Sequence, residues 1–235
     1  MLRKTFFALG FIAFCCGAGA LRARAQTDEP KFEAGVQFSA LRFEERGVCL
    51  REPCPNFVVT SSGQTEPGGG GRFGYNISRH VSVEAELNLF PRGEELEGGR
   101  KVQGLFGVKA GRRYESVGFF AKARPGFLRS RGSDFTPRPG IVCPAVFPPD
   151  IGCFDARPRT RTDFALDLGG VVELYPSRRV LVRFDLGDTL VFHDGEGNVA
   201  VRVPAGAGGS RLGVLPDPSD TTHNLQGSIG IGFRF

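Results

Sequence analysis

The segment HVSVEAELNL, residues 80–89, carries the pattern that decides the fold. Every second residue from Val81 to Leu89 is apolar, and the residues between them are polar. Successive side chains of a β-strand point to opposite faces, so as a strand this segment has one apolar and one polar face. A helix would repeat its apolar residues every three or four positions. The segment therefore predicts a strand that separates an apolar environment from a polar one.

The same alternation occurs in eight segments of the chain. They are residues 31–40, 71–77, 80–89, 101–111, 117–127, 162–174, 180–188 and 223–235. Pro125 falls inside the fifth segment, where it cannot donate a hydrogen bond to a neighbouring strand. We expect a bulge there, or a strand end that lies beyond a bilayer.

The connections between these segments alternate between short and long. The short ones are residues 78–79, 112–116 and 175–179, and the long ones are 44–67, 91–100, 128–161 and 190–221. Short turns on one rim and long loops on the other are typical of an outer-membrane barrel. The predicted fold is all-β: an eight-stranded antiparallel up-and-down transmembrane β-barrel with short periplasmic turns and long outer loops. Both ends of the mature chain then lie on the periplasmic side.

The polar face of the predicted strands carries acids and bases in nearly equal numbers. The acids are Glu33, Glu84, Glu86, Asp163, Asp167, Glu173 and Asp185, and the bases are Arg72, Lys109, Lys122, Arg124, Arg183 and Arg234. The interior of an eight-stranded barrel is just wide enough to be filled by side chains. We therefore expect an interior network of paired charges that closes the barrel. Its members are Arg72, Glu84, Glu86, Lys109, Lys122, Arg124, Asp167, Glu173, Arg183 and Asp185.

Two other interpretations of the alternating strands remain open. The interior charges could instead line a narrow channel for passive transport. A soluble lipocalin-like binding barrel also alternates, but it has its apolar side inside. The balanced charges on the polar face and the alternating loop lengths favour the membrane barrel.

The first 25 residues have the pattern of an export signal. Arg3 and Lys4 precede an apolar run at residues 5–21, and Ala23-Arg24-Ala25 fits a cleavage site before Gln26. The predicted domains are a cleaved signal peptide, residues 1–25, and an outer-membrane β-barrel domain, residues 26–235; a retained anchor is the alternative. Removing the four bases of the signal, which has no acid, lowers the net charge from +5 to +1. A nucleic-acid partner is therefore not expected.

Four cysteines follow the signal, namely Cys49, Cys54, Cys143 and Cys153. An exported chain meets an oxidising compartment, so we expect disulfides in the long loops at the cell surface. Four cysteines allow three pairings, of which proximity favours Cys49 with Cys54 and Cys143 with Cys153. A metal site would need closer spacing or a nearby histidine, so we expect no metal and no cofactor.

The chain resembles small outer-membrane β-barrels of the OmpA/OmpX type. The resemblance rests on the signal ending, on GRFGYNISRHVSVEAEL (71–87), on GVVELYPSRRVLVRFDLGD (170–188) and on GSIGIGFRF (227–235). In such families an aromatic C-terminus on an alternating strand is similar to the signal read by the barrel-assembly machinery. The resemblance assigns this role to Ile231, Phe233 and Phe235.

We expect an integral outer-membrane protein with a structural or surface-interaction role. Its expected partners are outer-membrane lipid, lipopolysaccharide and the barrel-assembly machinery. We expect a monomer without enzymatic activity. Lipid A deacylases of similar size use a His-x-Ser pair with a Glu, which His80, Ser82 and Glu84 superficially match. Their position at the short-turn rim argues against that activity.

His193 and His223 are interpreted as ordinary loop residues. The arginines of the third long loop could contact lipopolysaccharide or a surface ligand, or could simply be solvated. They are Arg129, Arg131, Arg157, Arg159 and Arg161.

Overall fold

A computed structural model describes residues 30–44, 46–49, 57–61, 63–91, 99–141, 149–205, 209–217 and 219–235. The predicted signal peptide lies outside these residues, so it and the domain boundary stay predictions. No helix in the described part of the chain is long and apolar enough to cross a membrane.

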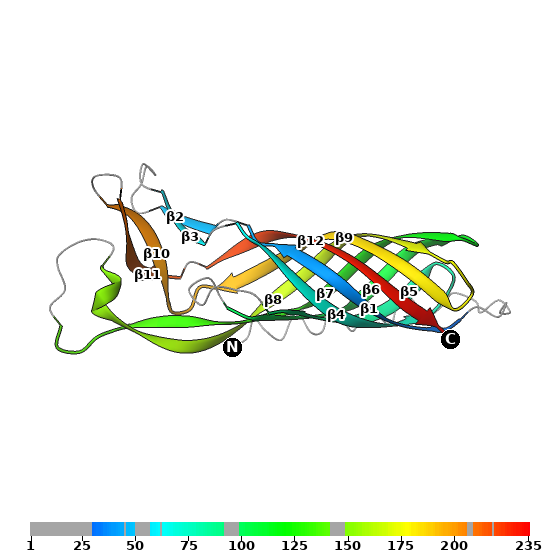
Figure 1. Cartoon of the computed structure of the whole chain (residues 1–235), viewed down its shortest axis with the longest axis horizontal. Coiled ribbons are helices and arrows are strands. Elements are labelled where there is room, and N and C mark those ends of the chain that lie inside the picture. Colours follow the sequence, from blue (N-terminus) through cyan, green and yellow to red (C-terminus); the bar gives the residue numbers. More distant parts are fainter. Residues whose placement is uncertain are drawn as a thin grey trace, which may run out of the picture.

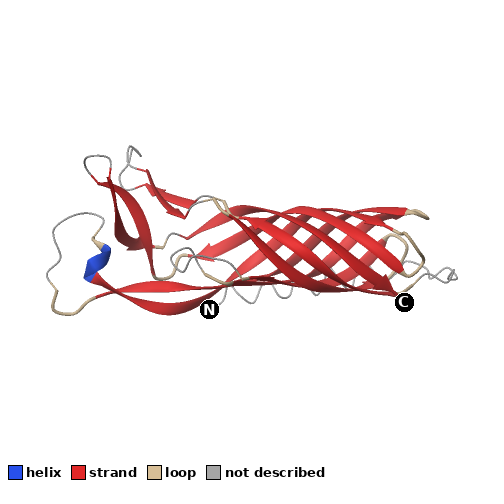
Figure 2. Ribbon diagram, viewed as in Figure 1, coloured by secondary structure: helices blue, strands red, loops and turns tan. Residues whose placement is uncertain are grey.

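Eight antiparallel strands close into a barrel (Figures 1 and 2). They are β1 (Phe32–Arg42), β4 (Thr65–Asn76), β5 (Val81–Phe90), β6 (Lys101–Arg113), β7 (Val117–Pro137), β8 (Phe154–Leu174), β9 (Val180–Asp194) and β12 (Ser219–Arg234). Neighbours in the chain are neighbours in the barrel, and β12 pairs with β1 to close it. The predicted fold class, with its eight strands, is confirmed.

Tight turns join the barrel strands at one end, which we call the short-turn end. In the turn between β4 and β5, the Ser78 hydroxyl accepts hydrogen bonds from the amides of His80 and Val81, at 3.2 and 3.1 Å. Ser177 does the same between β8 and β9, for the amides of Arg179 and Val180. Serine at the start of each turn thus satisfies amides that the turn leaves free.

Four further strands form a second sheet beyond the other end, which we call the long-loop end. They are β2 (Arg46–Cys49), β3 (Phe57–Ser61), β10 (Asn198–Ala205) and β11 (Gly209–Pro216), in the order β11-β10-β3-β2. Strands β7 and β8 are each 21 residues long and continue past the barrel toward this sheet (Figure 1). The sequence predicted only loops here, because β3 and β10 lie more than 130 residues apart and local alternation cannot reveal such a pairing.

The second sheet and the projecting parts of β7 and β8 form one unit, the loop head. The side chains of Phe135, Ala200 and Val214 form a small apolar core, against which Ile151 and Phe154 pack. Asp134 accepts hydrogen bonds from the amides of Phe135 and Asn198 at 3.0 and 2.9 Å and so joins β7 to β10. The loop head is therefore held by side chains as well as by strand pairing.

Pro125 lies in the middle of β7, and neither of the two expected solutions occurs. The pairing of β6 with β7 runs to Leu105 opposite Gly126 and resumes in the same register at Val108 opposite Ala123. On its other side Pro125 faces Leu166 of β8 in an unbroken ladder. A local gap in one ladder, without a bulge, accommodates the missing donor.

The apolar face of the barrel points outward and the charged face points inward. Val36, Phe106, Leu186 and Phe233 are between 56 and 64% exposed, whereas Arg124, Asp167 and Glu173 are fully buried. This is the arrangement of a membrane barrel and the reverse of a lipocalin. Outward rings gather toward both ends: Phe32 contacts Phe73, Tyr75 and Phe235 at the short-turn end, and Phe164 contacts Phe192 nearer the other end.

Candidate functional site: the barrel interior

Polar and charged side chains from all eight barrel strands meet inside the barrel. Strand β7 shows the order along the bore, because its inward residues are Phe120, Lys122, Arg124, Gly126 and Leu128 in succession. Along β7 the apolar side chains of Phe120 and Leu128 thus flank the charged side chains of Lys122 and Arg124. Ion pairs in such a dry interior are stable only when each charge has its partner.

Glu84 and Arg183 form the central ion pair of the interior. Glu84 Oε2 accepts from Arg183 Nη1 at 2.6 Å, and Glu84 Oε1 accepts from Arg183 Nη2 at 2.8 Å. This two-point geometry is the strong form of an arginine–carboxylate pair. Arg183 also reaches Asp185 at 2.8 Å, so two strands share its charge.

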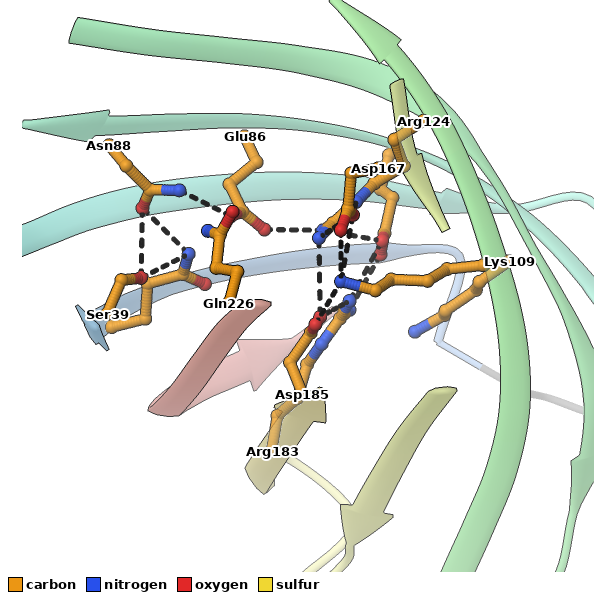
Figure 3. Close-up of polar contacts among 12 residues, drawn as sticks. Ser39, Glu86, Asn88, Lys109, Arg124, Asp167, Arg183, Asp185 and Gln226 are labelled. Carbon is orange, nitrogen blue, oxygen red and sulfur yellow. Dashed lines mark hydrogen bonds and ion pairs between the residues drawn. The ribbon is translucent and has the colours of Figure 1, made fainter. Parts of the chain in front are cut away.

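Arg124 links two further carboxylates, Glu86 and Asp167, to this pair (Figure 3). Its Nη1 lies 2.5 Å from Glu86 and 3.1 Å from Glu84, and its Nη2 lies 2.6 Å from Asp167. Lys122 bridges Asp167, at 2.8 Å, and Asp185. The network is therefore continuous from β5 through β7 and β8 to β9.

A second group of charges lies nearer the short-turn end. Lys109 contacts Glu33 at 3.1 Å and also Glu173. Arg113 lies 3.1 Å from the same Glu33. The Tyr175 hydroxyl donates to Glu173 at 2.8 Å and accepts from Arg113 Nε at 3.0 Å.

Nine of the ten predicted network residues are joined by ion pairs, and Arg72 is the exception. Arg72 is buried and faces inward, but its two Nη atoms find no hydrogen-bond partner within the described residues. Its guanidinium lies beside Gly35 and Gly232, which leave room for it. Arg72 belongs to the interior by position and not by pairing.

The wider set of inward charges divides between the network and the barrel ends. Glu33 joins the network, as described above. Asp163 pairs instead with Arg161 at 2.7 Å toward the long-loop end, and Arg234 stacks on the Tyr175 ring at 4.3 Å. The sequence analysis missed Arg113 and Tyr175, although both follow the inward alternation. Arg113 continues the series Lys109, Gly111 on β6, and Tyr175 comes two residues after the inward Glu173.

Amide side chains form a separate layer beside the charges (Figure 3). Gln37 donates to Asn88 at 2.9 Å, and Asn88 donates to Gln103 at 2.9 Å. Gln103 and Gln226 exchange hydrogen bonds at 2.8 and 3.1 Å. Leu128, Ala165 and Val191, with Phe43 packed against them, lie beyond this layer.

The His80, Ser82 and Glu84 combination does not form a catalytic arrangement. His80 is exposed in a turn, the Ser82 hydroxyl donates to Asn76 at 2.6 Å, and Glu84 is held by Arg183.

The interpretation of His193 and His223 as loop residues is wrong, since they lie in β9 and β12. His193 lies 3.1 Å from Asp163 and His223 lies 2.7 Å from Asp188. Within the described residues no cluster of three or more metal-ligating side chains occurs.

The four predicted disulfide cysteines are only partly described. Cys153 is buried at the end of a short 3-10 turn, η2 (Ile151–Cys153), and is disulfide-bonded. Cys54 and Cys143 lie outside the described residues, and of Cys49 only the backbone, at the end of β2, is described. Both pairings stay predictions.

A family model described as "Outer membrane protein beta-barrel domain" matches residues 11–235. The chain belongs to this family. Together with the inward charges and outward apolar face, this makes it a bacterial outer-membrane β-barrel. No curated protein matches the sequence significantly.

Several solved structures are similar to this chain at low sequence identity. The attachment invasion locus protein Ail of Yersinia pestis is 12% identical, with a TM-score of 0.44, over 88% of this chain and 99% of that one. Neisserial surface protein A is 12% identical, with a TM-score of 0.44, over 87% and 97%. The outer membrane protein OprG of Pseudomonas aeruginosa is 9% identical, with a TM-score of 0.43, over 88% and 96%.

Proposed function

We propose that this protein is a closed outer-membrane barrel whose role is structural or surface-interacting, without catalysis or passive transport. The observation that carries the proposal is the interior network, in which Glu84, Arg124 and Arg183 tie opposite walls together and occupy the bore. An ion that crossed this level would have to displace buried charges from their partners. Separating such partners is strongly unfavourable in a low-dielectric interior.

The loop head supports a surface-interaction role. Its strands pair across distant segments, and its core of Phe135, Ala200 and Val214 orders them. In outer-membrane barrels the short turns are periplasmic and the long loops are extracellular. We therefore place the loop head at the cell surface and both mature ends in the periplasm, where an ordered sheet can present a constant surface to a partner.

The C-terminal strand supports recognition by the barrel-assembly machinery. Ile231, Phe233 and Phe235 all point outward and are between 48 and 63% exposed. They are thus accessible on the last strand before the ring closes. We propose that they form the assembly signal and that the finished barrel is a monomer.

Conductance measurements test the closed barrel. We expect the wild-type protein, refolded and inserted into a planar bilayer, to show no discrete current steps. Heat-dependent gel mobility of the same preparation confirms that the barrel is folded. Reproducible steps from folded protein would instead support a narrow channel and would overturn the proposal.

Surface labelling tests the orientation. Ile141 is 44% exposed near the tip of the hairpin formed by β7 and β8. We expect an Ile141→Cys variant on intact cells to react with a membrane-impermeant maleimide above the wild-type background. Labelling that requires permeabilised cells would place the loop head on the periplasmic side.

A further inference from the structure

Three exposed arginines lie together toward the long-loop end, one directly before β6 and two on the outward face of β7. The Arg131 amide donates to the Arg100 carbonyl at 3.1 Å, so these two residues face each other across the strands. Arg129 lies two residues before Arg131 and therefore on the same face. We call Arg100, Arg129 and Arg131 the arginine patch.

The arginine patch has no counter-charge in the described part of the chain. Nearby arginines of the loop head do have one: Arg159 lies 3.2 Å from Glu196, and Arg138 lies 2.8 Å from Asp155. The patch residues face Thr160 and Thr162 on β8 instead, which pair with Arg131 and Arg129. Like charges placed side by side on one face of a sheet repel each other, so an external anion would stabilise this arrangement.

The patch lies where the outward surface changes from apolar to polar. Arg129 pairs with Val102 and follows Phe127, which is 41% exposed, on the same face. Phe127 pairs with Phe164, which is 52% exposed. Toward the short-turn end the surface is apolar, and toward the long-loop end it is charged. In a membrane this border is the level of the lipid head groups.

Acids occur on the outward surface of β9, the next strand in the ring after β8. Asp188 and Asp194 lie on the outward face of β9, and Asp188 contacts His223 of β12. Three adjacent exposed arginines thus lie on the β6–β7 side, although single basic residues such as Arg42 on β1 are exposed elsewhere. A uniform ring of solvated arginines would not show this asymmetry.

We propose that the arginine patch, with the hydroxyls of Thr160 and Thr162, binds the phosphate groups of an outer-leaflet glycolipid. Guanidinium groups bind phosphate with two parallel hydrogen bonds, and the threonine hydroxyls add further donors. The acyl chains of the lipid then lie against Phe127 and Phe164. The site rests on the proposed orientation, in which the long-loop end faces the cell surface.

Native mass spectrometry of the detergent-solubilised protein with bisphosphorylated lipid A tests this site. We expect lipid adducts on the wild-type protein, and a bound fraction lower by about tenfold or more on an R100Q/R129Q/R131Q variant, because charge-assisted hydrogen bonds are lost. The matched control is R42Q/R112Q/R157Q, which removes the same charge from exposed arginines outside the patch. We expect this control to bind as the wild type does.

Two results would overturn the proposal. One is equal lipid binding by the patch variant and the control, and the other is undiminished binding of lipid A from which both phosphates have been removed. Labelling of Ile141→Cys separates this failure from a failure of orientation. If Ile141→Cys is labelled on intact cells but the patch variant binds lipid A as well as the control does, the phosphate site is refuted. If the patch variant loses lipid binding but Ile141→Cys is not labelled on intact cells, the proposed orientation and the outer-leaflet source of the lipid are refuted.

Discussion

Glu84 on β5 and Arg183 on β9 are joined by two hydrogen bonds of 2.6 and 2.8 Å from diametrically opposite strands of the eight-stranded ring. Four strand-to-strand steps separate them in either direction around the barrel. The pair therefore acts as a strut across the bore and not as a link between neighbours. Arg124, which contacts Glu84 from β7, shares the same carboxylate.

Removing one member of this strut should be strongly destabilising. We expect Glu84→Ala to lower the free energy of unfolding by about 3–5 kcal/mol, because the Arg183 guanidinium is left buried without its main partner. Urea unfolding of the protein in lipid vesicles measures the change. The control is Glu196→Gln, which removes an exposed pair with Arg159 and should change stability by less than about 1 kcal/mol.

The double variant Glu84→Ala/Arg183→Ala distinguishes a pair from two independent residues. We expect it to lose less stability than the two single variants together, because it leaves neither charge of the strut unpaired. Additive losses in the same unfolding assay would show that the two residues act separately.

The Tyr175 hydroxyl should contribute measurably to the charges near the short-turn end. Tyr175→Phe removes one hydrogen bond to Glu173 and one from Arg113, both of them buried charged groups. We expect a loss of about 1–3 kcal/mol in the free energy of unfolding. Tyr114→Phe is the control, because Tyr114 is 54% exposed, and it should have almost no effect.

Gly126 permits the close approach of β6 and β7 beside Pro125. A Cβ at this position would overlap the carbonyl oxygen of Gly104, whereas a Cβ at Gly170 would lie 3.8 Å from the nearest atom, the carbonyl oxygen of Phe120. We expect Gly126→Ala to destabilise the barrel by about 1–3 kcal/mol or more, since backbone must move. Gly170→Ala should be tolerated. Similar midpoints of thermal unfolding for both variants would contradict this account.

Phe235 should matter more for assembly than for stability. The ring of Phe32 lies 5.9 Å from Phe235 and 5.9 Å from Phe73, so Phe235→Ala and Phe73→Ala each remove one comparable ring contact. We expect both variants, refolded in vitro, to lose about 0.5–1.5 kcal/mol from this pair beyond the lost apolar burial. In cells, the amount of folded, heat-modifiable protein should fall much further for Phe235→Ala. Equal amounts of the two variants would remove the assembly role.

Strand number and the inward or outward direction of side chains were predictable from local alternation. The segments around Val81–Phe90 and Val180–Asp194 show this best, because each side chain changes face with every residue. The strand ends were less predictable. Strands β7 and β8 continue into residues expected to be loop, since their projecting parts no longer separate lipid from a polar interior and need not alternate.

The sequence by itself determined that Glu84, Arg124 and Arg183 face inward, because a period of two decides the face of every residue in a strand. Which acid meets which base was decided only by the tertiary structure. Partners such as Glu84 and Arg183 lie 99 residues apart, and their height in the bore depends on the register of every strand between them. The same closure left Arg72 without an ion pair among the described residues and brought β3 and β10 together in the loop head.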